Sequence, residues 1–362
     1  MDVLTETHPY GNHPRQLLTV RYVPAEPVPC GIPERRAGLL MIHGGYWAQQ
    51  SGMGTWPEEF ARAGYVTLAP TYRLNTDAPW PACRDDVLAA LDWARDNADL
   101  FHLDPHRIAA LGSSAGGHLA ASIGALPGAR TPRAVAHHAP EDPEGRSVVL
   151  QLDNREQPQG LKGFVALSPP LNPALAWTDG ADPVGTWADK RTRLRDEAAR
   201  LAGCAPTECS DVWADMAVAS HASGPAADAP ALLVHYSDDL VPASHSEEYR
   251  TAQQHRGAAA SDVQLYVVKG RGHGMQAMEA PGIEPLIRAW LHARLAPVPV
   301  PCGPVEQPGP VPPAGGCCGG GADGPVPVPC GPVEQPGPVP PAGGGEGPAA
   351  PGPIGGCCPS PR

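Results

Sequence analysis

The sequence predicts an α/β fold in which a mainly parallel central sheet is flanked by helices, with a cap or lid insertion and a disordered Pro/Gly-rich C-terminal tail. Three observations predict it. Short apolar runs alternate with amphipathic stretches, a glycine-rich turn joins one such run to a helix, and the composition changes near residue 297. With 362 residues, 42% of them apolar, the chain is long enough to fill a large core.

Six apolar runs bounded by turn residues are predicted to form buried strands. They are residues 38–43, 65–70, 107–113, 163–169, 231–236 and 263–268. Helical patterns separate or follow these runs, at residues 57–63, 85–101, 115–125, 192–202 and 285–295. Because strands and helices alternate, the sheet is expected to be mainly parallel, with helices on both of its faces.

The composition divides the chain into a folded domain, residues 1–296, and a tail, residues 297–362. In the tail the segment PVPVPCGPVEQPGPVPPAGG occurs twice, at 297–316 and 325–344, among few large apolar residues. Such a segment cannot bury enough surface to offset the entropy of ordering it, so we expect an extended linker. Within the domain, residues 128–160 and 172–228 interrupt the alternation, and the second insertion is predicted to form a cap or lid.

The charge pattern argues against nucleic-acid and membrane partners. The formal net charge is −12, and the few lysines, Lys162, Lys190 and Lys269, are scattered, so no basic cluster for nucleic acid or an anionic membrane is expected. The N-terminal residues lack the pattern of a secretory signal, and no run is apolar enough for a membrane helix. A cytoplasmic location is therefore expected, and the oligomeric state is left open.

Four of the ten cysteines lie in the domain, at Cys30, Cys83, Cys204 and Cys209. For a cytoplasmic protein we expect them to be reduced thiols. The paired tail cysteines 317–318 and 357–358 have no histidine beside them, and His137 and His138 lack companions at ligand spacing. We therefore expect neither a metal site nor a cofactor.

A nucleophile is indicated by the sequence Gly112-Ser113-Ser114-Ala115-Gly116, which follows a predicted strand and precedes a predicted helix. This is the G-x-S-x-G pattern in the context that supports it, because the glycines let the chain turn sharply and expose the central hydroxyl. Ser114 is therefore the predicted nucleophile. Ser113 lies one residue from the centre of the turn and is expected to be a supporting hydroxyl.

A serine hydroxyl needs a base to take its proton and a carboxylate to orient that base. His273 follows the last predicted strand between two glycines, and it is the predicted base. Asp238 and Asp239 follow the preceding strand, and only one of them can face the ring. We favour Asp238, which lies four residues before Pro242 in a D-x-x-V-P type of turn, and keep Asp239 as the alternative.

Five motifs in this order resemble the α/β-hydrolase fold: HGGYW at 43–47, YRL at 72–74, GSSAGGHLA at 112–120, DDLVP at 238–242 and GHG at 272–274. The likeness covers residues 38–295. It is greatest to the HGG-bearing esterase and lipase branch, which includes hormone-sensitive-lipase-like carboxylesterases and kynurenine formamidases. Ser113 departs from both groups, since the first has an acidic residue there and the second often has histidine.

The resemblance implies that Gly44 and Gly45, together with Ala115, supply backbone N–H groups to an oxyanion hole. His43 precedes the nucleophile in the chain, so we expect it to be a structural residue. An apolar substrate pocket would draw on large aromatic side chains, and the candidates for its wall are Tyr46, Trp47, Trp80 and Trp177.

Three function classes follow from these residues. The leading hypothesis is a serine hydrolase that cleaves carboxylic esters of small or medium, partly apolar substrates through an acyl-enzyme. The alternative is a formamidase, amidase or biosynthetic acyl-transfer enzyme (peptidase, thioesterase or cyclase), because the same three side chains serve those reactions. A non-catalytic binding protein is disfavoured, since all three side chains are present. The expected partner is a small-molecule ester or amide.

Overall fold

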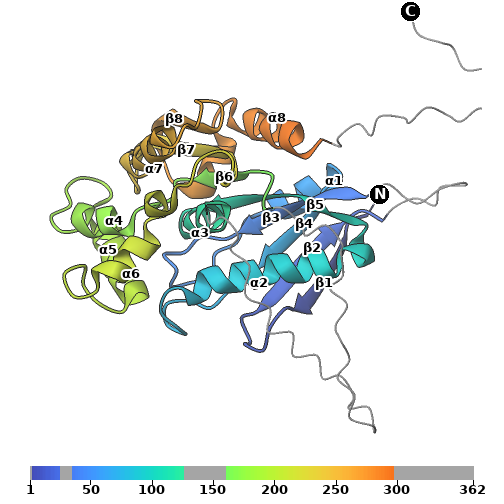
Figure 1. Cartoon of the computed structure of the whole chain (residues 1–362), viewed down its shortest axis with the longest axis horizontal. Coiled ribbons are helices and arrows are strands. Elements are labelled where there is room, and N and C mark those ends of the chain that lie inside the picture. Colours follow the sequence, from blue (N-terminus) through green and yellow to red (C-terminus); the bar gives the residue numbers. More distant parts are fainter. Residues whose placement is uncertain (1, 25–34, 126–159, 297–362) are drawn as a thin grey trace, which may run out of the picture. The chain divides into compact units, whose positions relative to one another are not determined.

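An eight-stranded sheet forms the centre of the protein (Figure 1), in the order β1-β2-β4-β3-β5-β6-β7-β8. The structure is a computed structural model that describes residues 2–24, 35–125 and 160–296. The neighbouring strands from β4 through β8 pair in parallel, whereas β2 pairs antiparallel with both β1 and β4. The strands are β1 Leu4–Pro9, β2 Leu17–Tyr22, β3 Arg36–Ile42, β4 Val66–Pro70, β5 Leu103–Ser113, β6 Phe164–Leu167, β7 Ala231–Asp239 and β8 Val263–Gly272.

The edge strand β1 and its antiparallel neighbour β2 were not predicted. Their residues are LTETHP and LLTVRY, and only the second has a buried face, at Leu18, Val20 and Tyr22. Every second residue of β2 is buried because successive side chains of a strand point to opposite faces. The other six strands each overlap a predicted apolar run, and β5, β7 and β8 extend beyond it.

Helices cover both faces of the sheet, and each face has its own hydrophobic core. Alternate residues of the inner strand β3 therefore pack in different clusters. On β3, Leu39 and Met41 pack in one cluster, and Leu40 and Ile42 pack in the other. The first cluster includes residues of α1 Trp56–Arg62, η3 Gly274–Glu279 and α8 Ile283–Leu295. The second includes residues of α2 Ala82–Asp96, η1 Ala98–Phe101, α3 Ala115–Gly124 and α7 Ser244–His255.

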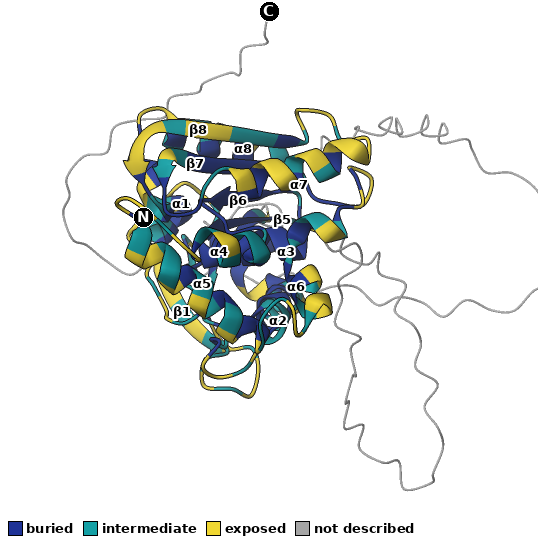
Figure 2. Cartoon of the chain, turned by 90° about the vertical axis from the view of Figure 1, so that its left-hand side faces the viewer, coloured by how far each residue is buried: buried dark blue, intermediate teal, exposed yellow. Residues whose placement is uncertain are grey.

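The insertion between β6 and β7 forms a group of helices beside one end of the sheet (Figure 1). It contains α4 Pro173–Asp179, α5 Ala188–Ala202, α6 Ser210–Met216 and η2 Val218–His221. We call these elements the cap. Figure 2 shows that α4, α5 and α6 each carry exposed residues, whereas β6 is buried throughout. On α5 the buried residues Leu194, Ala198 and Leu201 belong to the same core cluster as α3, so the cap packs on the body of the domain.

One cysteine pair corrects the prediction of reduced thiols. Cys204 and Cys209 form a disulfide in the cap, with their Cα atoms 6.1 Å apart, and Cys83 is a buried free thiol. Disulfides persist in oxidising compartments and are rare in the cytosol, so this pair does not favour the expected cytoplasmic location. The location stays a prediction.

Several sequence predictions lie outside the described residues. They concern Cys30, the histidines 137 and 138, most of the segment 128–160, and the tail with its repeat and six cysteines. The division into a domain and a tail therefore stays a prediction. In the ranges that are described, no helix is both long and apolar enough to span a membrane.

Candidate active site

Ser114 lies at a sharp turn between β5 and α3. Its φ of 53° and ψ of −121° are unusual for a residue with a side chain. The turn can close only because its flanking residues are glycines. A Cβ on Gly112 would lie 2.1 Å from the Gly116 carbonyl oxygen, and one on Gly116 would lie 2.1 Å from the Ile42 carbonyl oxygen. Helix α3 therefore begins in direct contact with β3, and Ser114 lies at its N-terminus.

The predicted nucleophile and base are hydrogen-bonded. The Ser114 Oγ lies 2.8 Å from His273 Nε2, although 159 residues separate them in the chain. His273 follows β8, and its backbone N–H donates to Gln276 Oε1 in η3 (2.9 Å). The imidazole keeps 19% of its side-chain surface exposed, so it lies between the core and the open site.

The third side chain of the group is Asp239, and the preference for Asp238 is wrong. Asp239 Oδ1 accepts from His273 Nδ1 at 2.7 Å, and its side chain is fully buried. Asp238 points to the opposite side of the strand, where it pairs with Arg271 (2.6 Å) and accepts from Trp187 Nε1 (2.8 Å). The pairing of β7 with β8 shifts register between Tyr236 and Asp238, and this irregularity fixes which carboxylate faces the ring.

The hydrogen bonds around Asp239 favour its ionised form. Its Oδ2 accepts from Ser168 Oγ (2.6 Å) and from the Tyr236 N–H (3.0 Å), and its Oδ1 also accepts from the Val241 N–H (3.1 Å). Burial by itself would raise the pKa of Asp239, but the contacts with His273, Ser168 and the Tyr236 N–H outweigh it and hold the pKa below its usual value.

Ser168 is a site residue that the sequence analysis missed. It follows β6, is fully buried at a φ of 49°, and also accepts from the Gly274 N–H (2.9 Å). Ser168 thus joins the acid to the residue after His273. The available clue was a polar residue at the carboxyl end of the strand predicted at 163–169, because the carboxyl ends of parallel strands meet at one edge of the sheet.

The glycines of the HGG loop lie against the nucleophile. A Cβ on Gly44 would meet the Ser113 carbonyl oxygen at 2.6 Å and Ser114 Cβ at 3.1 Å, so only glycine fits here. Gly45 has a φ of 119°. His43 stacks on Tyr72 at 4.4 Å, and its Nδ1 donates to the Gly44 carbonyl (2.7 Å). His43 is thus a buried support of this loop, as its place in the sequence indicated.

Trp47 and Trp80 are core residues, and the prediction that they line a substrate pocket is wrong. Trp47 is fully buried, and its Nε1 donates to Nδ1 of His118 in α3 (3.2 Å). Trp80 is 7% exposed and donates to Asp215 Oδ2 in the cap (2.6 Å). A buried indole N–H needs an acceptor, and both tryptophans find theirs inside the protein.

The other two predicted aromatic residues are partly exposed. Tyr46 follows Gly45 and carries the Arg193 guanidinium above its ring at 4.4 Å. Trp177 packs within the cap, edge-on to Trp213 at 5.8 Å and under Arg195 at 4.3 Å. Tyr46 therefore lies at the HGG loop, whereas Trp177 lies in α4 of the cap. Their contact with substrate stays a prediction.

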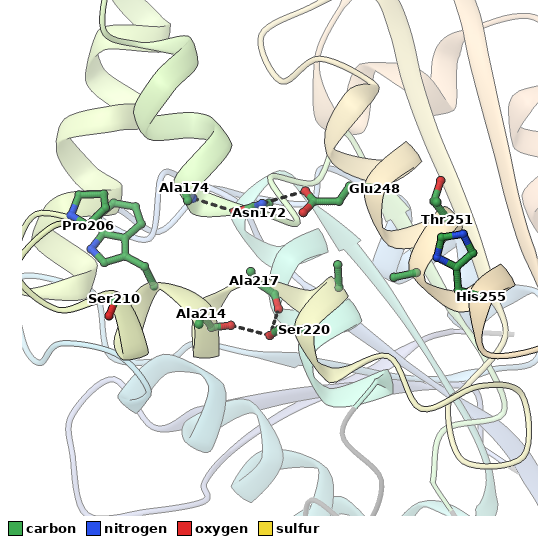
Figure 3. A pocket seen from close by; sticks show the side chains of 13 residues that line it. Asn172, Ala174, Pro206, Ser210, Ala214, Ala217, Ser220, Glu248, Thr251 and His255 are labelled. Atoms are coloured by element: carbon green, nitrogen blue, oxygen red, sulfur yellow. Dashed lines mark hydrogen bonds between the residues drawn. The ribbon is translucent and has the colours of Figure 1, made fainter.

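A separate cleft of about 640 Å³ lies between the cap and α7 (Figure 3). Across it Asn172, which precedes α4, donates to Glu248 of α7 (2.8 Å). The lining is mainly small and apolar, with Ala174, Pro206, Trp213, Ala214, Ala217 and Ala219 among its residues. Neither Ser114, Asp239 nor His273 lines this cleft, so it is distinct from the site described above.

Two buried histidines make the stability of the site region pH-dependent. His118 donates from Nε2 to the Met216 carbonyl (2.8 Å), and His235 contacts Ser246 Oγ through Nε2 (2.7 Å). Burial, the largest cause in both, lowers the pKa of each to about 4. In the unfolded chain a histidine takes up its proton near a pKa of about 6.5. Unfolding between these values therefore takes up protons that the folded state does not bind.

The free energy of unfolding is accordingly expected to fall as the pH is lowered from about 6.5 to about 4, with a slope of up to about 2.7 kcal/mol per pH unit for two protons. Urea unfolding at several pH values measures this slope. His235→Gln should reduce it by about half, and His255→Gln on the exposed surface of α7 should leave it unchanged. Stability that does not vary over this window would contradict the assignment of neutral buried imidazoles.

The geometry defines a class of protein. A serine at a strand-to-helix turn, a histidine after the last strand and an aspartate after the preceding strand, on a mainly parallel sheet, constitute the α/β-hydrolase fold. The BD-FAE family model matches residues 33–252. The chain therefore belongs to the BD-FAE family of α/β-hydrolase-fold esterases. In the residues that the structure describes, no three His, Cys, Asp or Glu side chains are grouped to hold a metal ion.

Curated relatives match over part of their length. Esterase LipC of Mycobacterium tuberculosis is 37% identical over 122 residues, which are 32% of this chain and 28% of LipC. Bovine arylacetamide deacetylase is 35% identical over 111 residues, 27% of each chain. Carboxylesterase NlhH of M. tuberculosis is 40% identical over 93 residues, 24% of this chain and 28% of NlhH. The matches thus span between a quarter and a third of the length of these relatives.

Solved structures support the fold. The esterase Est2 of Thermogutta terrifontis superposes with a TM-score of 0.54 at 24% identity, covering 82% of this chain and 95% of Est2. Esterase B of Lactobacillus rhamnosis superposes with a TM-score of 0.58 at 19% identity, covering 81% of this chain and 85% of that protein. These likenesses confirm the predicted fold class.

Proposed function

We propose that the protein is a carboxylic ester hydrolase in which Ser114 is the nucleophile, His273 the general base and Asp239 the orienting acid. The observation that carries the proposal is the continuous hydrogen-bonded series from Ser114 Oγ through both ring nitrogens of His273 to Asp239. The names of the curated relatives support ester hydrolysis as the reaction. Small or medium, partly apolar esters are the proposed substrates.

Acylation begins when His273 Nε2 takes the proton from Ser114 Oγ and that oxygen attacks the ester carbonyl carbon. The carbonyl oxygen becomes an oxyanion, which backbone N–H groups of Gly44, Gly45 and Ala115 are proposed to bind. Ala115 is the first residue of α3, where N–H groups have no partner within the helix and the helix dipole favours negative charge. His273 then protonates the departing alcohol, leaving an acyl-enzyme.

Deacylation repeats these steps with water. His273 takes a proton from a water molecule, and the resulting hydroxide attacks the acyl carbon. The Ser114–acyl bond breaks, His273 returns the proton to Ser114 Oγ, and the carboxylic acid leaves. Throughout, Asp239 keeps the proton of the neutral ring on Nδ1, so that Nε2 is free to accept, and stabilises the imidazolium when it forms.

The test is to incubate the protein with 4-nitrophenyl esters of short and medium chain length and with a fluorophosphonate that labels activated serines. The wild-type protein should hydrolyse the esters and be labelled, and Ser114→Ala should do neither. If the wild-type protein is neither labelled nor active on any ester, the proposal fails.

An amide substrate is the alternative within the same mechanism. It is supported by the name of the arylacetamide deacetylase relative. N-formylkynurenine, compared with the 4-nitrophenyl esters on the same preparation, distinguishes the two. A higher kcat/KM for the formamide would replace the ester in this proposal with an amide, whereas a higher value for the esters would support it.

A further inference from the structure

Helix α5 of the cap carries three cations in its first two turns, beside one acidic residue, Asp189. Its first six residues, Ala188 to Arg193, include Lys190, Arg191 and Arg193. The dipole and the unpaired N–H groups of a helix N-terminus stabilise acidic side chains and disfavour basic ones. The expectation of scattered basic residues therefore does not hold for this segment. Helix stability therefore does not explain the excess of basic over acidic residues in these turns.

Lys190 lies beside the proposed base, with one aromatic ring between them. Its Nζ is 4.7 Å from the centre of the Trp187 ring, and that ring is 6.5 Å from the His273 ring. Trp187 is held in place because its Nε1 donates to Asp238 (2.8 Å). In the described part of the chain no carboxylate lies within ion-pair distance of Lys190, whose side chain is exposed.

Arg193 lies over an aromatic ring of the HGG loop, as Lys190 lies over Trp187. Its guanidinium lies 4.4 Å above the Tyr46 ring and donates to Gln49 Oε1 (2.8 Å). Tyr46 directly follows Gly45, so again one aromatic ring separates a cation from the proposed chemistry. The Arg193 side chain is 45% exposed, and its carboxylate neighbour Glu197 is at the outer limit of ion pairing, 4.0 Å.

The two cations lie on one face of α5, because residues three apart on a helix are neighbours, with Cβ atoms about 5–6 Å apart. Arg191 has a different function, since it donates to the backbone carbonyls of Asp239 (2.9 Å) and Leu240 (3.1 Å) and so fixes the acid loop. Of the nearby carboxylates, Asp238 is paired with Arg271, Glu197 accepts from Asn75 (3.0 Å), and Asp189 is exposed. Among the described residues, Lys190 therefore has no ion pair and Arg193 has only the long one with Glu197, at 4.0 Å, so both cations can still attract an anion.

We propose that Lys190 and Arg193 form an anion-binding subsite at the entrance of the active site, and that the preferred esters carry a carboxylate away from the scissile bond. This inference rests on the proposed function and adds a substrate class to it. Lys190 lies on the Trp187 ring and Arg193 on the Tyr46 ring, so both would attract a carboxylate that an ester bound at Ser114 carries towards α5. The carboxylate belongs to the acyl group or to the alcohol, and the substrates below distinguish the two.

The experiment compares matched anionic and neutral esters. For the acyl side the pair is 4-nitrophenyl hemiadipate and 4-nitrophenyl hexanoate, which have the same chain length. For the alcohol side the pair is 4-acetoxybenzoate and 4-acetoxybenzamide. The quantity measured is the ratio of kcat/KM for the anionic ester to that for the neutral one, and comparing this ratio between variants cancels the intrinsic reactivity of each ester.

For at least one pair the ratio should fall by about 3- to 30-fold in Lys190→Gln/Arg193→Gln, the range for losing two partly exposed charge contacts. The charge-conserving Lys190→Arg/Arg193→Lys should keep most of the ratio. Arg200→Gln, later on the same helix and 57% exposed, is the matched control and should leave the ratio unchanged. In the wild-type protein the ratio should also fall between 20 mM and 500 mM NaCl, because salt screens exposed charges.

A ratio that stays within about twofold of wild type for both pairs in the Gln/Gln variant, or parallel losses for anionic and neutral esters, would overturn the subsite. That outcome is distinguishable from failure of the proposed function. If the function fails, the neutral esters are not turned over above the rate of Ser114→Ala. If only the subsite fails, the wild-type protein hydrolyses the neutral esters with no charge-dependent preference.

Discussion

Asp239→Asn is expected to lower kcat by about 10³- to 10⁴-fold, the loss found when the aspartate of a Ser-His-Asp triad is replaced by asparagine. Both oxygens of Asp239 accept hydrogen bonds, Oδ1 from His273 and Val241 and Oδ2 from Ser168 and Tyr236. An amide NH₂ at the position of Oδ1 would donate to His273 Nδ1 and force the proton of the imidazole onto Nε2, which then could not accept from Ser114. An NH₂ at the position of Oδ2 would face the N–H of Tyr236, so two donors would meet without an acceptor.

Asp238→Asn is the matched control for this prediction. Asp238 contacts Arg271 and Trp187 and does not contact the His273 ring, so its replacement should change kcat by less than about tenfold. Steady-state kinetics on a 4-nitrophenyl ester measures both variants, with circular dichroism to confirm that each is folded. A larger loss for Asp238→Asn than for Asp239→Asn would identify Asp238 as the acid and contradict the geometry.

Gly44→Ala is expected to lower kcat by about 10²- to 10³-fold, the cost of losing one oxyanion donor. A Cβ at this position would lie 2.6 Å from the Ser113 carbonyl oxygen, which belongs to the backbone and cannot rotate away. The HGG loop would have to move, and its N–H groups would no longer point at the oxygen of the substrate. Because the loop moves while the core remains, the loss should appear in kcat more than in the free energy of unfolding.

Gly52→Ala tests whether that loss is specific to the site. Gly52 belongs to the same connection between β3 and α1, but an added Cβ there would meet only the Gly54 nitrogen, at 3.8 Å, an ordinary contact. Its kcat should stay within about threefold of wild type. The two variants are compared by kcat, KM and urea unfolding. If Gly44→Ala retains wild-type kcat, Gly44 does not supply a donor that matters to the reaction.

Much of the fold followed from local patterns. The runs that became β3 to β7 are mostly apolar because both faces of a parallel sheet are covered, and the helices between them have one apolar stripe. The edge strand β1 was missed because it is mostly exposed and gives little apolar contrast, and its neighbour β2 was missed although one of its faces is buried. Edge strands have less to bury, so the composition that identifies central strands is weak in them.

The side-chain contacts of the site followed the prediction where one residue had a unique local context, and departed from it where two neighbours competed. Ser114 and His273 each lie between glycines after a strand, and the structure brings them to 2.8 Å of each other. Asp238 and Asp239 have the same context, and spacing to Pro242 favoured the wrong one. The register shift between β7 and β8 decides between them, and a shift in pairing is a property of two strands together.

The aromatic and cysteine predictions failed for different reasons. Trp47 and Trp80 have the size and polarity of pocket residues, but acceptors on α3 and the cap, His118 and Asp215, draw their indole groups into the core. Cys204 and Cys209 are only five residues apart, and the turn between α5 and α6 brings them within bonding distance. The acceptors of the tryptophans come from segments distant in the chain, whereas the cysteine prediction rested on the expected compartment and not on the separation of the two residues.

The sequence alone determined the class of fold, the order of its central elements, and the serine and histidine of the site, because strand, turn and helix patterns are local and the glycines of sharp turns are directly visible. Only the tertiary structure decided which aspartate faces the imidazole, that Ser168 supports it, and that the cations of α5 lie one aromatic ring from the site. Those facts depend on strand register and on the packing of the cap over the sheet, which join residues that are distant in the chain.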